Sequence, residues 1–110
     1  MKITEQPPIE FNKDCSIRKA IMLIDAKHSI MIFNELLKHK VLRFGQLRKV
    51  LGNINTRTLT TTLKQLETAG LVKRQVYGEI PPKVEYSLTE KGEELKTVLL
   101  PLQLWYEKWY

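Results

Sequence analysis

The 110-residue sequence predicts a mainly helical α+β fold, in which four helices are followed by two strands and a final helix. Apolar residues recur at three- and four-residue intervals in several segments between residues 16 and 69, and again over 90–109, as in amphipathic helices. Between these segments, residues 84–89 alternate apolar and polar side chains, as a half-buried strand does. Two short consecutive helices before a β-hairpin are typical of a winged helix-turn-helix. We therefore expect this architecture, with a two-stranded β wing.

The first half of the chain should contain an arm and three helices. Residues 1–14 are polar and contain two prolines, so we expect a flexible N-terminal arm before a single domain at 15–110. One helix should begin at Ser16, the next should span 27–40 and end in basic residues, and the third should span 43–51 before Gly52 and Asn53. The apolar side chains that should share one face are Ile17, Ala20, Ile21 and Ile24 in the first helix, Ile30, Phe33, Leu36 and Leu37 in the second, and Phe44, Leu47 and Leu51 in the third.

The fourth expected helix, residues 56–69, is unusually rich in threonine. Asn55 or Thr56 can serve as its N-cap, and Gly70 supplies its stop. At about 100° per residue, the leucines at positions 59, 63 and 66 lie within roughly 40° of Leu59 and form a buried stripe. The opposite and flanking positions hold Arg57, Thr58, Thr60, Thr61, Lys64, Gln65 and Thr68.

This outward face is chemically suited to reading DNA. Each threonine costs roughly 0.5 kcal/mol of helix propensity relative to alanine, so a helix built only for solubility would favour alanine and Glu–Lys pairs. A hydroxyl can bond a phosphate oxygen or a base edge, and the threonine methyl can pack on thymine. Arg57 is placed to form two hydrogen bonds with guanine, and Lys64 to meet a phosphate. The alternative is an ordinary solvent-exposed face.

The net charge of +6 is confined to the middle of the chain. Eight Lys and Arg but only two Glu lie between residues 43 and 83, and the rest of the chain is electrically balanced. Such clustering favours a patch for a polyanion over an evenly solvated surface. The residues that we expect to contact double-stranded DNA are Arg43, Thr56, Arg57, Thr58, Thr60, Thr61, Lys64, Gln65, Lys73, Arg74 and Lys83.

The last segment, residues 90–110, is expected to form a dimerisation helix capped by Thr89, in which Pro101 causes a kink or an interruption. Its apolar ladder is wider than one small core needs, which favours a homodimer interface over packing within the monomer. The expected interface residues are Ile17, Ile21, Leu99, Leu102, Trp105, Tyr106 and Trp109. A two-fold dimer would read a pseudo-palindromic operator.

Several function classes are disfavoured. His28 and His39 are the two histidines, and no metal-ligand spacing, phosphate-binding Gly loop or nucleophile–base pair accompanies them. We therefore expect no enzymatic activity, no metal and no cofactor. A winged helix that contacts only other proteins is the second hypothesis, and it would bind DNA with little or no salt dependence.

The composition also indicates a compartment. The single cysteine excludes an intrachain disulfide, which points to a reducing environment. The N-terminus lacks the apolar core of a signal peptide, and no apolar stretch reaches the roughly 20 residues that a membrane helix needs. We expect a cytoplasmic protein that makes no membrane contact.

The sequence resembles the HxlR-type winged-helix transcriptional regulators, which are relatives of the MarR group. The similarity extends from Cys15 to about Trp105 and is strongest in "GEIPPKVEYSLTEKG", close to the family's wing signature. "RFGQLRKVLGNINTRTLTTTLKQLETAGLVKR" matches the family's Arg-Phe-x-x-Leu opening and Gly-Leu-Val-x-Arg ending. The resemblance implies a dimeric DNA-binding regulator, expected to be a repressor, whose Thr-rich helix enters the groove and whose terminal helices form the dimer.

The chain departs from the family pattern in two places and matches it at a cysteine. Residues 25–28 read Asp-Ala-Lys-His where the family usually has Gly-Gly-Lys-Trp, and residues 53–55 read Asn-Ile-Asn where it has Gly-Ile-Ser. Cys15 occupies the position of a cysteine that senses oxidants or electrophiles in some members. Lys13 and Arg18 would favour a reactive thiolate there, whereas Asp14 would oppose it. Cys15 is therefore either a redox sensor or an inert buried residue, and small-molecule control is the other form of regulation that we consider.

Overall fold

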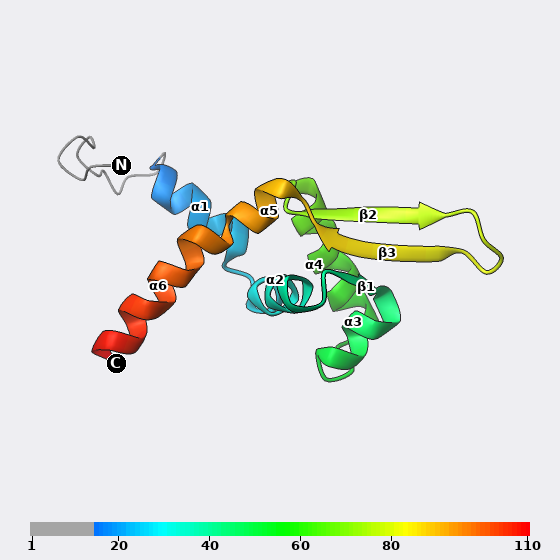
Figure 1. Ribbon diagram of the computed structural model, residues 1–110, viewed down its shortest axis with the longest axis horizontal. Coiled ribbons are helices and arrows are strands. Elements are labelled where there is room, and N and C mark those ends of the chain that lie inside the picture. Colours follow the sequence, from blue (N-terminus) through cyan, green and yellow to red (C-terminus); the bar gives the residue numbers. More distant parts are fainter. Residues whose placement is uncertain (1–14) are drawn as a thin grey trace.

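The computed structural model describes residues 15–110, so the arm expected at 1–14 lies outside the described part of the chain (Figure 1). The wing projects from one end of the molecule, whereas α1 and the C-terminal half of α6 project from the other (Figure 1). In chain order the elements are α1 (Ser16–Ile24), α2 (Lys27–His39), β1 (Val41–Arg43), α3 (Phe44–Val50), α4 (Thr56–Thr68), β2 (Val72–Tyr77), β3 (Lys83–Leu88), α5 (Glu90–Glu94) and α6 (Lys96–Trp109).

The core lies where α2, α3 and α4 meet the sheet. Its most deeply buried large side chains are Ile32 and Leu36 of α2, Leu47 of α3, and Leu59 and Leu63 of α4. The stripe predicted for α4 is confirmed, because the third leucine of that stripe is buried in the same cluster. This helix is therefore anchored along one side over its whole length.

The predicted face of α2 is partly wrong. The buried side chains of this helix are Ser29, Ile32, Phe33 and Leu36, while Ile30 remains 41% exposed. The helix carries two adjacent apolar rows, and the core takes the row that contains Ile32. The other row turns towards α6, where it lines a groove instead of the core.

The sheet contains the expected wing and one additional strand. β2 and β3 pair antiparallel as a hairpin, and β1 pairs antiparallel with the other edge of β3, giving the order β1-β3-β2. The sequence offers no signal for β1, because three residues are too few to show an alternating pattern. Tyr86, at the centre of β3, is buried against the core.

The boundaries of α4 follow the predicted signals. Asn55 is the N-cap, and the chain leaves the helix through Gly70, whose φ of +76° is readily adopted by glycine. Gly52 and Asn53 likewise adopt φ values of +75° and +59° after α3. The turns on both sides of α4 thus depend on residues that readily adopt a positive φ.

The segment expected to form one C-terminal helix is divided into α5 and α6 at Leu95. Pro101 lies inside α6 and does not end it. Thr89 caps α5 as predicted, since its hydroxyl oxygen accepts a hydrogen bond from the Gly92 N–H at 3.1 Å. In the described part of the chain, no helix is long and apolar enough to span a membrane.

The start of α5 is fastened to the turn that follows α4. The Thr89 hydroxyl donates to the Gly70 carbonyl, and the Lys91 ammonium donates to the Ala69 carbonyl at 2.6 Å. A Cβ at Gly92 would collide with the backbone carbonyl oxygen of Leu71. The close approach at this junction therefore requires a glycine.

We predict opposite effects of two glycine substitutions in helices. Gly92→Ala should lower the free energy of unfolding by about 1–3 kcal/mol, because the new methyl overlaps backbone that cannot easily move. Gly45→Ala in α3 should raise it by up to about 1 kcal/mol, because nothing lies within 4 Å of that position and alanine favours helix. Urea denaturation at matched protein concentrations measures both changes. An equal gain from the two substitutions would contradict the close contact at Gly92.

Candidate nucleic-acid interface

The helix-turn-helix is held in register by polar contacts at the turn between α3 and α4. The Asn55 side chain accepts hydrogen bonds from the backbone N–H groups of Arg57 and Thr58, at 2.9 and 3.2 Å. The Arg48 Nε donates to the Ile54 carbonyl at 3.0 Å and so ties α3 to the residue just before the cap. The sequence analysis did not identify this role for Arg48, because the contact depends on the path of the turn.

The threonines of α4 differ in burial. Thr56, Thr60, Thr61 and Thr68 are exposed, whereas Thr62 is buried. The Thr62 hydroxyl donates to the Thr58 carbonyl one turn earlier, at 2.8 Å, which satisfies its polar group inside the core. One threonine thus has a structural role, and it was not among the predicted contacts.

The remaining candidates on α4 lie where the helical spacing placed them. Arg57, Lys64 and Gln65 are exposed, and Thr58 is half-buried beside the N-cap. The exposed Thr60 hydroxyl donates its proton to the Thr56 carbonyl at 2.8 Å, so its oxygen is left to act as an acceptor. The outward face of α4 therefore offers both cationic donors and hydroxyl groups.

The strand register divides the basic wing residues between the two faces of the sheet. Directly paired residues of antiparallel strands point to the same side. Arg74 pairs with the buried Tyr86 and shares its side, whereas Lys73 pairs with Ser87 and Arg43 with Glu85 on the other side. The structure thus does not bring all of the predicted contacts onto one surface.

Arg74 is the wing residue that lies beside α4. It lines a cavity of about 260 Å³ together with Thr60 and Lys64 of that helix. Glu67 lies on the same cavity and places one acid among these basic groups. This cavity lies between α4 and the base of the wing.

Lys83 and Arg43 lie on the opposite side of the sheet, near Glu85. The Lys83 Nζ is 3.5 Å from a Glu85 carboxylate oxygen and 4.9 Å from the centre of the Tyr77 ring. The hydrogen bond from Tyr77 to Glu85, and then the negative charge of Glu85, raise the pKa of the Tyr77 phenol above its ordinary value. Glu85 therefore partly neutralises Lys83, a contact that the linear sequence did not reveal.

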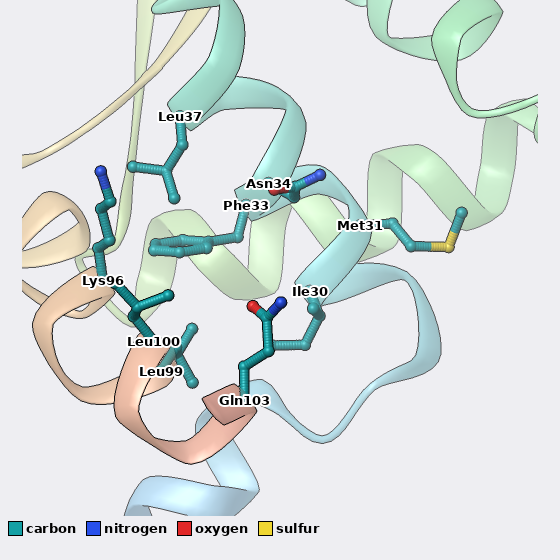
Figure 2. Close-up of a pocket in the computed structure, with 9 residues that line it drawn as sticks. All are labelled: Ile30, Met31, Phe33, Asn34, Leu37, Lys96, Leu99, Leu100 and Gln103. Carbon is teal, nitrogen blue, oxygen red and sulfur yellow. The ribbon is translucent and has the colours of Figure 1, made fainter. Parts of the chain in front are cut away.

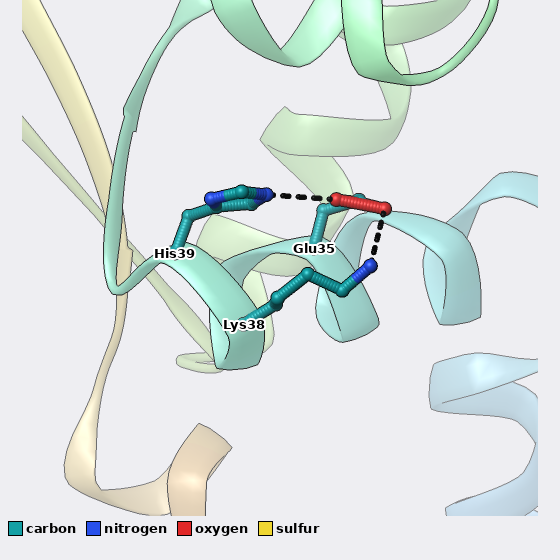
Figure 3. Close-up of polar contacts among 3 residues, drawn as sticks. All are labelled: Glu35, Lys38 and His39. Carbon is teal, nitrogen blue, oxygen red and sulfur yellow. Dashed lines mark ion pairs between the residues drawn. The ribbon is translucent and has the colours of Figure 1, made fainter.

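A separate polar cluster marks the C-terminal end of α2 (Figure 3). The carboxylate of Glu35 lies 3.8 Å from the Lys38 ammonium and 3.5 Å from the His39 Nε2, and its side chain is 16% exposed. These contacts join residues three and four positions apart on one helix. Across residues 15–110, no group of three or more His, Cys, Asp or Glu side chains is arranged to hold a metal ion.

The terminal helices leave their apolar side chains exposed. Neither α1 nor α6 contains a buried residue. Leu99 is half-buried, and the other expected interface residues are exposed: Ile17, Ile21, Leu102, Trp105, Tyr106 and Trp109. Cys15, immediately before α1, is buried. Packing within one chain therefore does not cover the apolar ladder of the C-terminal helix.

Comparisons with known proteins agree with this architecture. A family model described as HxlR-like helix-turn-helix matches residues 23–110. The chain is 46% identical over 96 residues to the helix-turn-helix-type transcriptional regulator sll1512 of Synechocystis sp., which covers 87% of this chain and 70% of the relative. Among solved structures, a MarR-family transcriptional regulator from Enterococcus faecalis has a TM-score of 0.82 at 35% identity, covering 94% of this chain and 93% of the other. The redox regulator HypR in its oxidized form has a TM-score of 0.75 at 36% identity, covering 86% and 96% respectively.

The contact between Tyr77 and Glu85 can be tested by titration. We predict that Glu85→Gln lowers the pKa of Tyr77 towards its ordinary value of 10.0, because the substitution removes both the charged acceptor and the nearby negative charge. Glu79→Gln removes an equal charge from the adjoining loop and should lower this pKa less. NMR spectra of ¹³C-labelled tyrosine, recorded from neutral to alkaline pH, resolve the individual phenols. Equal shifts in the two variants would show that no specific hydrogen bond links these side chains.

Proposed function

Because the chain belongs to the HxlR-like helix-turn-helix family of transcriptional regulators, which are not enzymes, we propose that it binds a specific operator in double-stranded DNA as a homodimer. The observation that carries the proposal is the outward face of α4. This face combines an arginine, a lysine and several hydroxyls on a helix whose other side is locked into the core. Such a helix can enter the major groove without disturbing its own packing.

We propose that α4 supplies the sequence-reading contacts. Arg57, next to the N-cap, would donate two hydrogen bonds to the O6 and N7 of a guanine. Thr56, Thr60 and Thr61 would contact base edges or thymine methyl groups. Lys64, further along the helix and beside Arg74, would bind phosphate. Specificity would then come mainly from the N-terminal half of the helix.

The wing, together with Arg43 just before α3, would add contacts to the DNA backbone. Arg74 is the best placed, since it shares a cavity with two residues of α4. Lys73, Lys83 and Arg43 would reach flanking phosphates from the other face of the sheet. Lys83 would have to exchange its ion pair with Glu85 for a phosphate, which reduces its net contribution.

We propose that the dimer forms through the terminal helices. Trp105 and Trp109 are 55% and 64% exposed in the single chain, and aromatic side chains of this size usually bury against a partner. A two-fold dimer would present two copies of α4 to half-sites about one or two turns of DNA apart, in a pseudo-palindrome. Binding of such a dimer at a promoter would exclude other proteins, so we propose repression.

We further propose that oxidation of Cys15 regulates the protein, with the redox regulator HypR as supporting precedent in a chain of similar fold. Two Cys15 thiols from different subunits would lose two protons and two electrons to a peroxide, forming a disulfide while the peroxide is reduced to water. A mixed disulfide with a small thiol is the other product. Because Cys15 is buried, the reaction would require movement at the start of α1.

The salt dependence of binding to non-specific duplex DNA tests the proposal as a whole. Neutralisation of phosphates releases counterions, so the logarithm of affinity should fall steeply and linearly with the logarithm of salt concentration. Fluorescence anisotropy with a labelled duplex measures this slope. If the chain shows no detectable affinity for the duplex, or an affinity that does not change with salt concentration, the result would instead support a winged helix that contacts only proteins.

We predict different consequences for two basic residues. Arg57→Ala should relax sequence preference, costing about 1–3 kcal/mol at one operator position, because a base contact is lost. Lys83→Ala should weaken all duplexes alike and reduce the salt slope by at most about 1, because it contacts only phosphate. Lys19→Ala removes the same charge from α1, a helix at the end opposite the wing (Figure 1), and serves as control. Unchanged binding in both test variants would overturn the assignment of these surfaces to DNA.

Regulation through Cys15 gives a separate prediction. Hydrogen peroxide should change operator affinity of the native chain at least several-fold, and this change should be reversed by a dithiol reductant. Cys15→Ser should abolish the response while leaving affinity in reductant unchanged. Electrophoresis without reductant, together with mass spectrometry, distinguishes an intersubunit disulfide from a mixed disulfide. A response that persists in the serine variant would exclude the thiol as its origin.

A further inference from the structure

The wing tip, residues 78–82 between β2 and β3, carries an apolar side chain that its own chain leaves uncovered. Ile80 is 100% exposed. Pro81 and Pro82 follow it and are exposed as well. Figure 1 shows this loop at the end of the wing, away from the labelled helices. Packing within residues 15–110 therefore does not account for this isoleucine.

A larger apolar surface lies between α2 and α6 (Figure 2). Figure 2 shows the Phe33 ring extending from α2 towards α6, with Leu99 and Leu100 opposite. These side chains line a groove of about 520 Å³. Because the groove borders a terminal helix, the homodimer proposed above offers a partner for it. That dimer offers none for the wing tip, which projects from the opposite end of the molecule (Figure 1).

The loop that carries Ile80 rises from a fastened pair of residues. Tyr77 and Lys83 are the last paired residues of the hairpin. The Lys83 Nζ lies 4.9 Å from the centre of the Tyr77 ring, and the Glu85 carboxylate accepts a hydrogen bond from the Tyr77 phenol. Each of the two prolines fixes its own φ and restricts the residue before it to extended backbone. Ile80 is therefore presented on a short and stiff support.

The wing tip has no positive charge of its own. Its sequence is Gly-Glu-Ile-Pro-Pro, in which Glu79 is the one ionisable side chain. The adjoining strands are basic, with Lys73 and Arg74 in β2 and Lys83 in β3. A phosphate group would be repelled by Glu79 at the tip and attracted by the cations along the strands. The tip is thus suited to an apolar contact that is flanked by electrostatic ones.

We propose that Ile80 acts as an apolar wedge in the DNA minor groove beside each half-site, and that the chain thereby bends its operator. Proteins that bend DNA in this way insert side chains such as Ile and Pro between base steps, and kink the duplex by about 20–90°. Lys73 and Lys83 would bind phosphates at the edges of the same groove. This activity rests on the DNA binding proposed above and adds a deformation of the duplex to it.

The length of the wing matches the distance between neighbouring grooves. Five residue steps separate Val72 from Tyr77 in β2, and at about 3.3 Å per step they span about 17 Å. On one face of B-form DNA, a major groove and the next minor groove are half a turn apart, which is also about 17 Å. With α4 in a major groove and Arg74 beside that helix, the wing tip would reach the adjacent minor groove.

The minor groove fits the wing tip better than a protein partner does. A stable protein interface buries about 1,200–2,000 Å², whereas the tip ends a two-stranded ribbon in one isoleucine and two prolines. The minor groove is about 6 Å wide, which suits a narrow loop. The tip is also continuous with the basic strands that we assign to DNA. These observations favour DNA as the molecule that covers Ile80.

Bending is tested by energy transfer between dyes at the two ends of a duplex that the native chain enriches from a random library. The native chain should bring the dyes closer together. Ile80→Ala should lose most of the bend and about tenfold in affinity, because the wedge is removed. Ile80→Leu keeps an apolar side chain of the same size and should retain both. Circular dichroism confirms that each variant is folded.

Ile30→Ala is the matched control, because it removes the same atoms from a 41% exposed position on α2. It should leave the bend and the affinity unchanged. A native bend that persists in Ile80→Ala overturns the wedge while leaving DNA binding by α4 intact, and it would favour a protein as the partner of the tip. If the library yields no enriched duplex, the proposed function fails and the wedge fails with it.

A charge at the tip separates insertion from mere proximity to DNA. Ile80→Lys should make the salt slope steeper by about 1, because the new ammonium neutralises one phosphate. It should not restore the bend, because a charged side chain does not insert between bases as an apolar one does. A bend that persists in Ile80→Lys, or a salt slope that does not change, would show that the tip does not insert into the minor groove.

The wedge also predicts a sequence preference outside the positions that α4 reads. Pyrimidine–purine steps such as TA are easily unstacked, whereas A-tracts are stiff. Replacing a TA step by an A-tract, about half a turn beyond the centre of a half-site, should weaken binding of the native chain several-fold. Ile80→Ala should be much less sensitive to this replacement. Equal losses for the two proteins would overturn the wedge.

Discussion

The structure depends on the burial of one side of α4. Leu59, Leu63 and Leu66 are buried where α2, α3 and the sheet converge, so this helix cannot rotate without exposing them. Because its orientation is fixed from within, its outward residues form a stable chemical surface. Asn55 and Gly70 define the two ends of that surface through a side-chain cap and a left-handed turn. Packing, rather than the threonines themselves, therefore decides which side chains can meet another molecule.

The features of α4 and the wing could be predicted because they are encoded locally. Leucine spacing, an N-cap asparagine and a terminating glycine are all read within a few residues, and the structure confirms each of them. The features that were missed depend on distant partners. β1 is too short to show a period, and the core face of α2 is decided by which of two apolar rows meets the sheet. The contact of Arg48 with Ile54 likewise requires the folded turn.

The wing shows why residue type alone cannot define a binding surface. Lys73 and Arg74 are adjacent in sequence and chemically similar, but a strand places them on opposite faces. Arg74 consequently lies beside α4, whereas the Lys83 ammonium lies near the Glu85 carboxylate and the Tyr77 ring. The sequence shows in which part of the chain positive charge is concentrated, but the strand register determines which of these charges lie on the same face.

The junction between α4 and α5 links the helix-turn-helix to the terminal part of the molecule. Thr89 and Lys91, at the start of α5, bond to the carbonyls of Gly70 and Ala69, just beyond α4. α6 begins immediately after Leu95, so a short segment separates this junction from the helix that carries the exposed aromatic side chains. If two α6 helices associate, this junction transmits their relative position to the two copies of α4. The spacing between the half-sites proposed above would then depend on how the terminal helices pack.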